Sequence, residues 1–295
     1  MSLIIPDYVG IGAPRTGSRW LCQCLSEHPE LSIVDHEVSF FTTRRVIHPN
    51  WHKGVEWYSD ILREAKTPGT LIGEITPVYL FDGDTAEKIS SVAPNVKLIC
   101  CVRDQLDRAF SAYRLVLHHS PLLTPKSYPF KKFLTYCGDI YGIEGFYLEH
   151  IERFLKFFSR EQLLILVYDD LKKTPEFFLK QVYQSLNVDA EFQAPSLITK
   201  INDMPVGSSP KVHDQNTGLK NTIKKMKREI KTKLNSLRKP TVKNAEKQGF
   251  LITDEIREMM HVLYHDHNIK LGKMLGRDLS HWNRVGNKHP RDSSR

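Results

Sequence analysis

Residues 6–25 decide the fold, and their sequence is Pro6-Asp-Tyr-Val-Gly-Ile-Gly-Ala-Pro-Arg-Thr-Gly-Ser-Arg-Trp-Leu-Cys-Gln-Cys-Leu25. The apolar run at residues 8–11 predicts a buried strand. The glycines and proline after it predict a turn, and the apolar spacing from Trp20 to Leu25 predicts a helix. In α/β proteins this arrangement binds phosphate, because the loop N–H groups and the positive end of the helix point at one spot. The stretch therefore predicts an anion site, with an ordinary tight turn as the alternative.

The loop itself, residues 12–18, is G-A-P-R-T-G-S and differs from the nucleotide-hydrolase pattern G-x-x-x-x-G-K-S/T. The glycine spacing is kept, but no lysine follows Gly17, and the cations are Arg15 and Arg19 instead. A loop without that lysine and its metal-holding hydroxyl is a poor candidate for ATP hydrolysis. It is still suited to binding an anion.

The composition is that of a globular protein with a basic balance. The 295 residues suffice for one large domain or two small ones. The formal charge of +8 indicates an acidic partner, such as a nucleotide, an anionic glycan, nucleic acid or a membrane surface. We expect no membrane-spanning segment and no signal peptide, because no apolar stretch approaches roughly 20 residues and the first strand begins almost at once. The five cysteines form no metal or disulfide pattern, so we expect reduced thiols and a cytoplasmic protein.

Strands and helices alternate along the rest of the chain. Residues 96–102 form the most apolar run, as expected for a parallel strand that is buried on both faces. This alternation predicts an α/β fold of the P-loop type with three layers, in which helices flank a central, mainly parallel sheet. A helical C-terminal region follows. The other predicted strands are at 31–34, 70–74 and 162–168, and the predicted helices are at 84–93, 105–117, 144–158 and 174–186.

The C-terminal third differs in composition. Residues 199–218 are polar, and residues 219–239 predict a basic amphipathic helix. That helix either packs one face on the domain or contacts the acceptor or a membrane surface as a peripheral element. We expect a closing helix pair at residues 256–275. The whole is then one domain, residues 1–286, with a variable basic insertion at 199–260 and a disordered tail at 287–295.

Several polar groups follow the carboxyl ends of predicted strands, where ligands of open parallel sheets bind. The first strand leads to Arg15 and Arg19, and the third ends at Glu74. The fourth is followed by Arg103, with Ser111 two turns into the next helix. An anion loop, a carboxylate and a second anion site are therefore expected to converge on one edge of the sheet.

These motifs also carry a resemblance to a known family. The chain resembles the sulfotransferases that use 3'-phosphoadenosine 5'-phosphosulfate (PAPS), and among them the heparan sulfate enzymes and their bacterial relatives. The most specific element is an arginine followed eight residues later by a serine, directly after a buried strand. Residues 199–260 match poorly. The matching segments are G-A-P-R-T-G-S-R-W-L (12–21), H-E-V-S-F-F (36–41), G-E-I-T-P-V-Y-L (73–80), C-V-R-D-Q-L-D-R-A-F-S-A-Y (101–113), Y-G-I-E-G-F-Y (141–147) and L-G-K-M-L-G-R-D-L-S-H-W (271–282).

The resemblance implies a role for each site residue. Arg103 and Ser111 would hold the 3'-phosphate of PAPS. Glu74 would be the general base that accepts the proton of a hydroxyl on a saccharide, glycolipid or small molecule, as that oxygen attacks sulfur. The product would be 3',5'-adenosine bisphosphate, and the family needs no metal. The loop residues that would surround the 5'-phosphosulfate are Arg15, Thr16, Gly17, Ser18, Arg19 and Trp20.

Two positions depart from the family pattern. Arg15 stands where the family usually has lysine, so it can stabilise charge on a leaving phosphate oxygen but cannot donate its proton near neutral pH. His36 stands where the heparan sulfate enzymes tend to have lysine, directly before Glu37. We expect His36 and Glu37 to contact the acceptor, to orient Glu74 or to serve only in packing. His36 is also the second candidate for the catalytic base.

Other functions stay open as alternatives. A catalytically degenerate member of the fold would bind an anionic glycan or a membrane through its basic face. A P-loop kinase for a small molecule is disfavoured by the missing lysine after Gly17. The spacing of His265 and His267 resembles that of a pair of metal ligands. On a helix, however, the side chains of residues i and i+2 point in different directions, so we expect no metal. We also expect no nucleic-acid partner, and the sequence determines neither the acceptor nor the oligomeric state.

Overall fold

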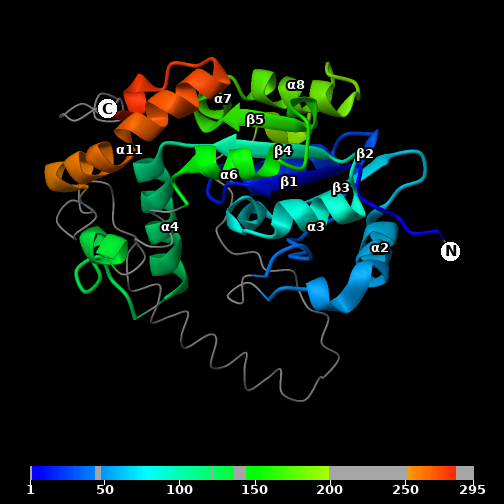
Figure 1. Ribbon diagram of the computed structural model, residues 1–295, viewed down its shortest axis with the longest axis horizontal. Coiled ribbons are helices and arrows are strands. Elements are labelled where there is room, and N and C mark those ends of the chain that lie inside the picture. The colour runs from blue at the N-terminus through cyan, green and yellow to red at the C-terminus, as the bar shows by residue number, and fades with distance from the viewer. Residues whose placement is uncertain (1, 44–47, 121, 136–143, 199–251, 284–295) are drawn as a thin grey trace.

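The central sheet of this protein has five parallel strands in the order β2-β3-β1-β4-β5 (Figure 1). The computed structural model describes residues 2–43, 48–120, 122–135, 144–198 and 252–283. Apolar runs form the strands, as predicted, because parallel strands are buried on both faces. The strands are β1 (Tyr8–Gly12), β2 (Leu31–Ile33), β3 (Leu71–Ile75), β4 (Lys97–Val102) and β5 (Leu163–Val167).

The strand order places a topological switch point at β1. The chain leaves β1 for β2 and β3 on one side, then crosses to β4 and β5 on the other. Val9 pairs with Glu74 of β3 and with Leu98 of β4, so the three strands end at the same edge. Open α/β sheets bind ligands in the crevice that forms there.

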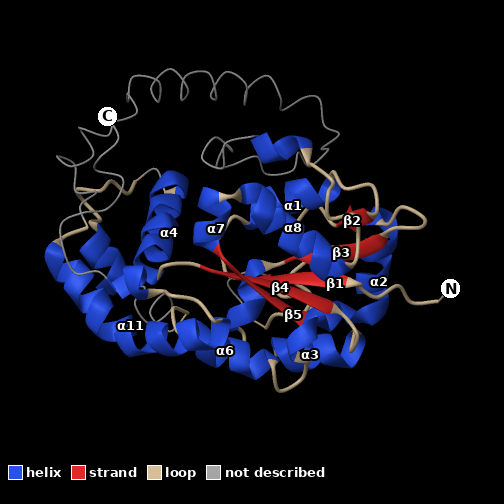
Figure 2. Ribbon diagram, turned by 90° about the horizontal axis from the view of Figure 1, so that it is seen from above, coloured by secondary structure: helices blue, strands red, loops and turns tan. Residues whose placement is uncertain are grey.

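Helices cover both faces of the sheet, which confirms the predicted three-layer α/β fold (Figure 2). One apolar core lies under α1 (Ser18–Ser26), α7 (Tyr168–Lys173) and α8 (Pro175–Leu186). The other lies under α2 (Gly54–Ala65), α3 (Thr85–Val92) and α6 (Tyr147–Phe154). A third apolar cluster joins α4 (Gln105–His119) to α11 (Asp254–Leu275). Short 3-10 helices are η2 (Trp51–Lys53), η3 (Pro77–Phe81), η4 (Arg160–Gln162), η5 (Pro195–Ile198) and η7 (Ser280–Asn283).

Two local predictions were wrong. The expected helix pair at 256–275 is one helix of 22 residues, α11. Thr253 caps its start, because the Thr253 hydroxyl accepts a hydrogen bond from the Ile256 N–H, and Gly276, with φ 62°, caps its end. The expected strand at 162–168 ends at Val167, and the unpredicted helix α7 begins at once with Tyr168. A sharp strand-to-helix turn therefore lies at the ligand-binding edge.

The predictions for residues 199–218, 219–239 and 287–295 lie outside the described residues. Among the helices that the structure does describe, none combines the length and the apolar character that crossing a membrane requires.

Candidate active site

The anion loop joins β1 to α1, and two of its glycines are required by geometry. Gly12 has φ 142°, and a Cβ on it would lie 2.3 Å from the Pro77 carbonyl oxygen. Gly17 has φ 88°, and its Cβ would lie 2.7 Å from Leu171 Cδ2. Both positions exclude other residues because of close approach and positive φ. Arg15 also has positive φ, 70°, which is uncommon for a residue with a side chain.

The side chains of this loop divide into inner and outer ones. The Thr16 hydroxyl donates to the Ala13 carbonyl at 2.6 Å and is buried. The Trp20 indole is also buried and donates to the Ser196 carbonyl at 3.3 Å. Thr16 and Trp20 therefore have only their backbone N–H groups to offer to a ligand. Ser18 is partly exposed and Arg19 is exposed at the start of α1.

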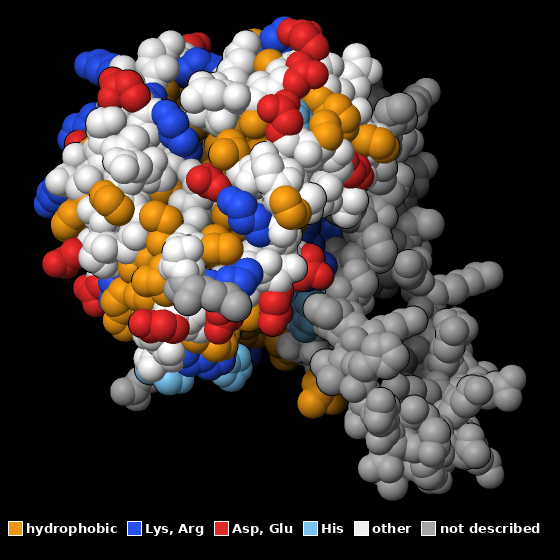
Figure 3. All heavy atoms as spheres, turned by 90° about the vertical axis from the view of Figure 1, so that its right-hand side faces the viewer, with side chains coloured by type: hydrophobic (Ala, Val, Ile, Leu, Met, Phe, Trp, Pro, Cys, Tyr) orange, Lys and Arg blue, Asp and Glu red, His pale blue; other side chains and the backbone are white. Residues whose placement is uncertain are grey.

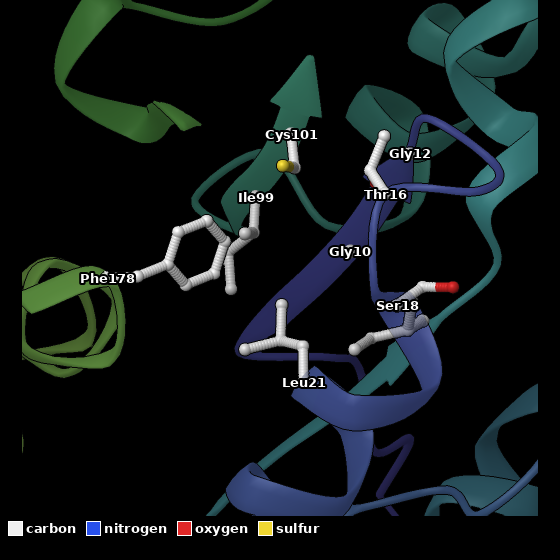
Figure 4. A pocket seen from close by; sticks show the side chains of 9 residues that line it. Gly10, Gly12, Thr16, Ser18, Leu21, Ile99, Cys101 and Phe178 are labelled. Carbon is white, nitrogen blue, oxygen red and sulfur yellow. The ribbon is translucent and has the colours of Figure 1, made fainter. Parts of the chain in front are cut away.

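A cavity of about 20 Å³ lies beneath the loop, between Gly10, Thr16, Leu21, Cys101 and Phe178 (Figure 4). It holds about one water molecule, so an anion the size of a phosphate has to lie on the outer side of the loop. The Ser18 side chain points away from Phe178 (Figure 4).

Arg15, Arg103 and Ser111 come together, as predicted from their positions after β1 and β4. Arg15 Nε donates to Ser111 Oγ at 3.1 Å, and Arg103 Nη1 donates to the Arg15 carbonyl at 2.9 Å. These contacts join residues that are 88 and 96 positions apart in the chain. The loop cation and the second cation–hydroxyl pair thus form one continuous site.

Arg103 is held by residues that the sequence analysis did not identify. Its guanidinium lies 4.4 Å from the centre of the Tyr168 ring, and its Nη2 lies 3.6 Å from the Asp107 carboxylate. Arg103 Nε is buried and has no hydrogen-bond partner within the described residues, which suits an anion acceptor. Lys172 Nζ lies 4.9 Å from the same tyrosine ring. Tyr168 directly follows the carboxyl end of β5, so the rule that identified Arg103 would also have identified Tyr168.

A second carboxylate, Asp104, caps the helix that carries Ser111. Asp104 Oδ1 accepts a hydrogen bond from the Asp107 N–H at 2.7 Å. Burial, together with the nearby Asp107 carboxylate, raises the pKa of Asp104 to about 7. An anion bound at Arg103 would act in the same direction as Asp107 and favour the protonated form of Asp104.

Glu74 is not exposed at this site. Its side chain has no solvent-accessible surface, and both carboxylate oxygens accept hydrogen bonds. Tyr58 and Tyr79 donate to Oε1 at 3.1 and 2.9 Å, and Thr76 donates to Oε2 at 2.6 Å. Burial raises the pKa of Glu74 to about 7, and these hydrogen bonds oppose the rise. This burial disfavours direct contact between Glu74 and an acceptor hydroxyl.

Glu37 and His36 are exposed and follow β2 at the same edge of the sheet. Although the Glu37 side chain meets solvent, surrounding protein atoms partly desolvate its carboxylate and raise its pKa, and the Arg19 guanidinium opposes the rise. The pKa of the Cys22 thiol on α1 is raised mainly by burial, then by the Asp35 charge and to a smaller extent by the Glu37 charge. Cys22 Sγ on α1 also lies 3.9 Å from the Val34 carbonyl oxygen, so the chain that leads from β2 to Glu37 passes beside the first turns of α1. His36 Nδ1 lies 2.9 Å from Asp35 Oδ1.

The described residues contain no group of three or more His, Cys, Asp and Glu side chains that could hold a metal ion. His265 and His267 thus have no such partners in this part of the chain. On the face that carries β2 and α2, Lys and Arg side chains are interspersed with Asp and Glu (Figure 3). That face is therefore mixed in charge.

The sheet order, the glycine loop at the switch point and the adjoining cation–hydroxyl pair define the P-loop-type α/β class of proteins. A family profile described as "Sulfotransferase domain" matches residues 6–264. The chain therefore belongs to the sulfotransferase domain family.

Comparisons with single proteins agree with this family. Mouse heparan sulfate glucosamine 3-O-sulfotransferase 3B1 is 29% identical over 197 residues, which cover 62% of this chain and 46% of the relative. The human protein of the same name is 31% identical over 192 residues, with 62% and 46% covered. The chain thus spans about half the length of the curated relatives it matches. A sulfotransferase structure from Alicyclobacillus acidocaldarius shares the fold, with a TM-score of 0.65, 20% identity and coverage of 96% of this chain and 100% of that one.

Proposed function

We propose that this protein transfers a sulfuryl group from PAPS to a hydroxyl group of an acceptor and releases 3',5'-adenosine bisphosphate. The observation that carries the proposal is the continuous site of Arg15, Ser111 and Arg103, in which the Arg103 guanidinium bonds to the Arg15 carbonyl and the Arg15 guanidinium bonds to the Ser111 hydroxyl. A donor with phosphate groups at both its 3' and 5' positions needs two adjoining anion sites of this kind. ATP has no phosphate at the 3' position.

The donor would be held by charge-assisted hydrogen bonds. Arg103 Nε has no partner within the described part of the chain, so it is free to donate to the 3'-phosphate together with the Ser111 hydroxyl. Bonds of this kind are worth about 1.5–3 kcal/mol each. The backbone N–H groups of residues 16–18 and the Arg15 guanidinium would bind the 5'-phosphosulfate. As the sulfur–oxygen bond breaks, Arg15 would stabilise the negative charge on the leaving phosphate oxygen.

We assign the general base to Glu37 in place of Glu74. The acceptor oxygen attacks sulfur, its bond to hydrogen breaks, and a carboxylate beside the anion loop takes the proton. Glu37 is exposed there, and its raised pKa favours proton acceptance near neutral pH. Glu74 has no exposed surface. His36, paired with Asp35, is the second candidate.

The acceptor class is a saccharide, a glycolipid or a small molecule with a free hydroxyl. The relatives named above are heparan sulfate enzymes, so an undersulfated heparan chain is the first acceptor to test. A cytoplasmic location is also part of this proposal, supported by the free cysteines Cys22, Cys24, Cys100 and Cys101. Contact of residues 219–239 with acceptor or membrane is a separate prediction.

The donor site is tested by thermal unfolding with 3',5'-adenosine bisphosphate. At 100 times its dissociation constant the ligand should add about 2.7 kcal/mol to the wild type. Arg103→Ala should reduce this gain strongly. Lys97→Ala is the matched control, because Lys97 begins the strand that Arg103 follows but lies at the opposite edge of the sheet. Equal stabilisation of all three proteins would refute the donor site.

Turnover separates the enzyme from the alternatives. Transfer of radiolabelled sulfate from PAPS to a desulfated heparan chain, a glycolipid or a 4-nitrophenyl glycoside supports the proposal. Binding of the bisphosphate without transfer to any of these indicates the degenerate, non-catalytic protein. Stabilisation by ATP with magnesium, but not by the bisphosphate, indicates a kinase. Glu37→Gln should lower turnover by at least about 100-fold while the bisphosphate still binds.

A further inference from the structure

The segment that carries Glu37 has no regular secondary structure. It runs from His36 to Thr43, after β2, and it is extended or bent throughout. Its apolar side chains are fully buried all the same: Val38 is 1% exposed, and Phe40 and Phe41 are not exposed. Buried backbone N–H groups in such a segment have no ladder or helix to bond to, so they need other partners, such as side chains.

Glu74 supplies those partners for the first half of the segment. The Val38 backbone lies close enough to the Glu74 carboxylate to lower the pKa of Glu74. The Ser39 N–H donates to Thr76 Oγ1 at 3.2 Å, and that hydroxyl in turn donates to Glu74. The Ser39 backbone is therefore linked to one buried carboxylate by two successive hydrogen bonds.

Tyr79 extends the same network along the segment. The Phe41 N–H donates to Tyr79 Oη at 3.3 Å, and Tyr79 Oη donates to Glu74 at 2.9 Å. Tyr58 adds a further hydroxyl from α2, and its ring stacks on Phe40 with the centroids 4.4 Å apart. Glu74 thus joins α2, η3 and the Glu37 segment.

Asp82 holds the second half of the segment in the same way. Its carboxylate accepts from the Thr42 hydroxyl at 2.7 Å and from the Thr43 N–H at 2.6 Å. The Thr43 hydroxyl also donates to it at 3.1 Å. Glu74 and Asp82 flank η3, so a single stretch of chain, residues 74–82, supplies both carboxylates.

A buried carboxylate is a poor choice if packing is all that the site requires. Well-packed apolar residues of similar volume usually replace buried charged groups without loss of stability. A carboxylate can do what they cannot, which is to accept several hydrogen bonds at once and fix the groups that donate them. Catalytic groups need support of this kind, since displacement by about 1 Å costs about 100-fold in rate.

We propose that Glu74 and Asp82 are positioning residues that hold Glu37 beside the anion loop. The inference rests on the proposed role of Glu37 as general base. Glu37 is two residues from Ser39, whose N–H is linked to Glu74 through the Thr76 hydroxyl. An ordered backbone at Ser39 limits where the Glu37 carboxylate can lie. Glu74 then acts on the reaction through the segment and not by contact with the acceptor.

The test compares Glu74→Gln with Glu37→Gln, using PAPS and the acceptor identified by the turnover assay. Glu74→Gln should lower kcat about 10- to 100-fold and leave the KM for PAPS within about twofold. Deuterium exchange of a peptide covering residues 34–43 should become at least about tenfold faster in Glu74→Gln and stay unchanged in Glu37→Gln. Glu87→Gln, an exposed carboxylate on α3, is the matched control and should match the wild type in both measurements.

Each contrary result has one meaning. Wild-type kcat and wild-type exchange in Glu74→Gln would overturn the positioning role. Unchanged turnover in Glu37→Gln would overturn the proposed base and this inference with it. Abolished turnover in Glu74→Gln with unchanged exchange would make Glu74 the base itself. If Glu74→Gln does not fold, Thr76→Val keeps the Glu74 carboxylate but removes the hydroxyl that links Ser39 to it, and the same two measurements apply to that variant.

Discussion

Replacement of Glu74 by glutamine should change how the stability of this protein depends on pH. The pKa of Glu74 is about 7 in the folded protein, against 4.5 for an ordinary glutamate side chain, because burial disfavours its charge. The contribution of Glu74 to stability is therefore fully present below pH 4.5 and is lost as the pH rises from there through 7. A difference of that size corresponds to about 3 kcal/mol. Glutamine does not titrate, so the variant loses nothing over this range.

The assay is urea denaturation of the wild type and Glu74→Gln at pH 5.5 and pH 8.5. At each pH the free energy of unfolding of the wild type is subtracted from that of the variant. The difference should shift in favour of the variant by about 2 kcal/mol between the two pH values, at roughly 1.4 kcal/mol per pH unit up to pH 7. The titratable groups that bond to Glu74 are Tyr58 and Tyr79, whose pKa values are raised well above 10, so they stay protonated throughout.

Asp82→Asn is the control with the opposite sign. Hydrogen bonds from Thr43, Thr42 and Asp84 together outweigh burial and lower the pKa of Asp82 below 3.8. Its stabilising effect is therefore present throughout the range from pH 5.5 to 8.5 and is lost only in stronger acid. The difference between Asp82→Asn and the wild type should stay constant over that range. A constant difference for Glu74→Gln as well would refute the reasoning, because it would mean that Glu74 does not titrate near neutral pH.

Three further substitutions test the framework of the site. Gly12→Ala should destabilise the protein by at least about 1–3 kcal/mol, since its Cβ would lie 2.3 Å from the Pro77 carbonyl oxygen; a wild-type melting temperature would contradict this. Glu144→Gln should cost about 3–5 kcal/mol in urea denaturation, because it removes the negative charge that lies 3.1 Å from the fully buried Arg108 guanidinium; a loss under 1 kcal/mol would show that the charge is compensated elsewhere. Tyr168→Ala should weaken stabilisation by 3',5'-adenosine bisphosphate, because the ring lies 4.4 Å from the Arg103 guanidinium and such contacts are worth about 0.5–2 kcal/mol; unchanged thermal stabilisation would remove Tyr168 from the donor site.

The sequence carried the general outline of the fold because local signals are strong there. Parallel strands buried on both faces are continuous apolar runs, so residues 96–102 predicted a strand that the structure has at Lys97–Val102. The convergence of Arg15, Arg103 and Ser111 also followed from sequence, because strand ends in a parallel sheet share one edge. By contrast, α7 was missed because β5 enters it at Tyr168 without an intervening turn residue.

The sequence by itself determined the α/β class, the anion loop and the two cations of the candidate donor site. These depend on apolar periodicity, on glycines and on the order of strands, all of which are local properties of the chain. Only the tertiary structure decided which carboxylate meets solvent, because the exposure of a side chain depends on what packs over it. Glu74 and Glu37 are both acidic residues near strand ends, and the chain alone does not rank them. The hydroxyls of Tyr58, Thr76 and Tyr79 close over Glu74 and leave Glu37 exposed.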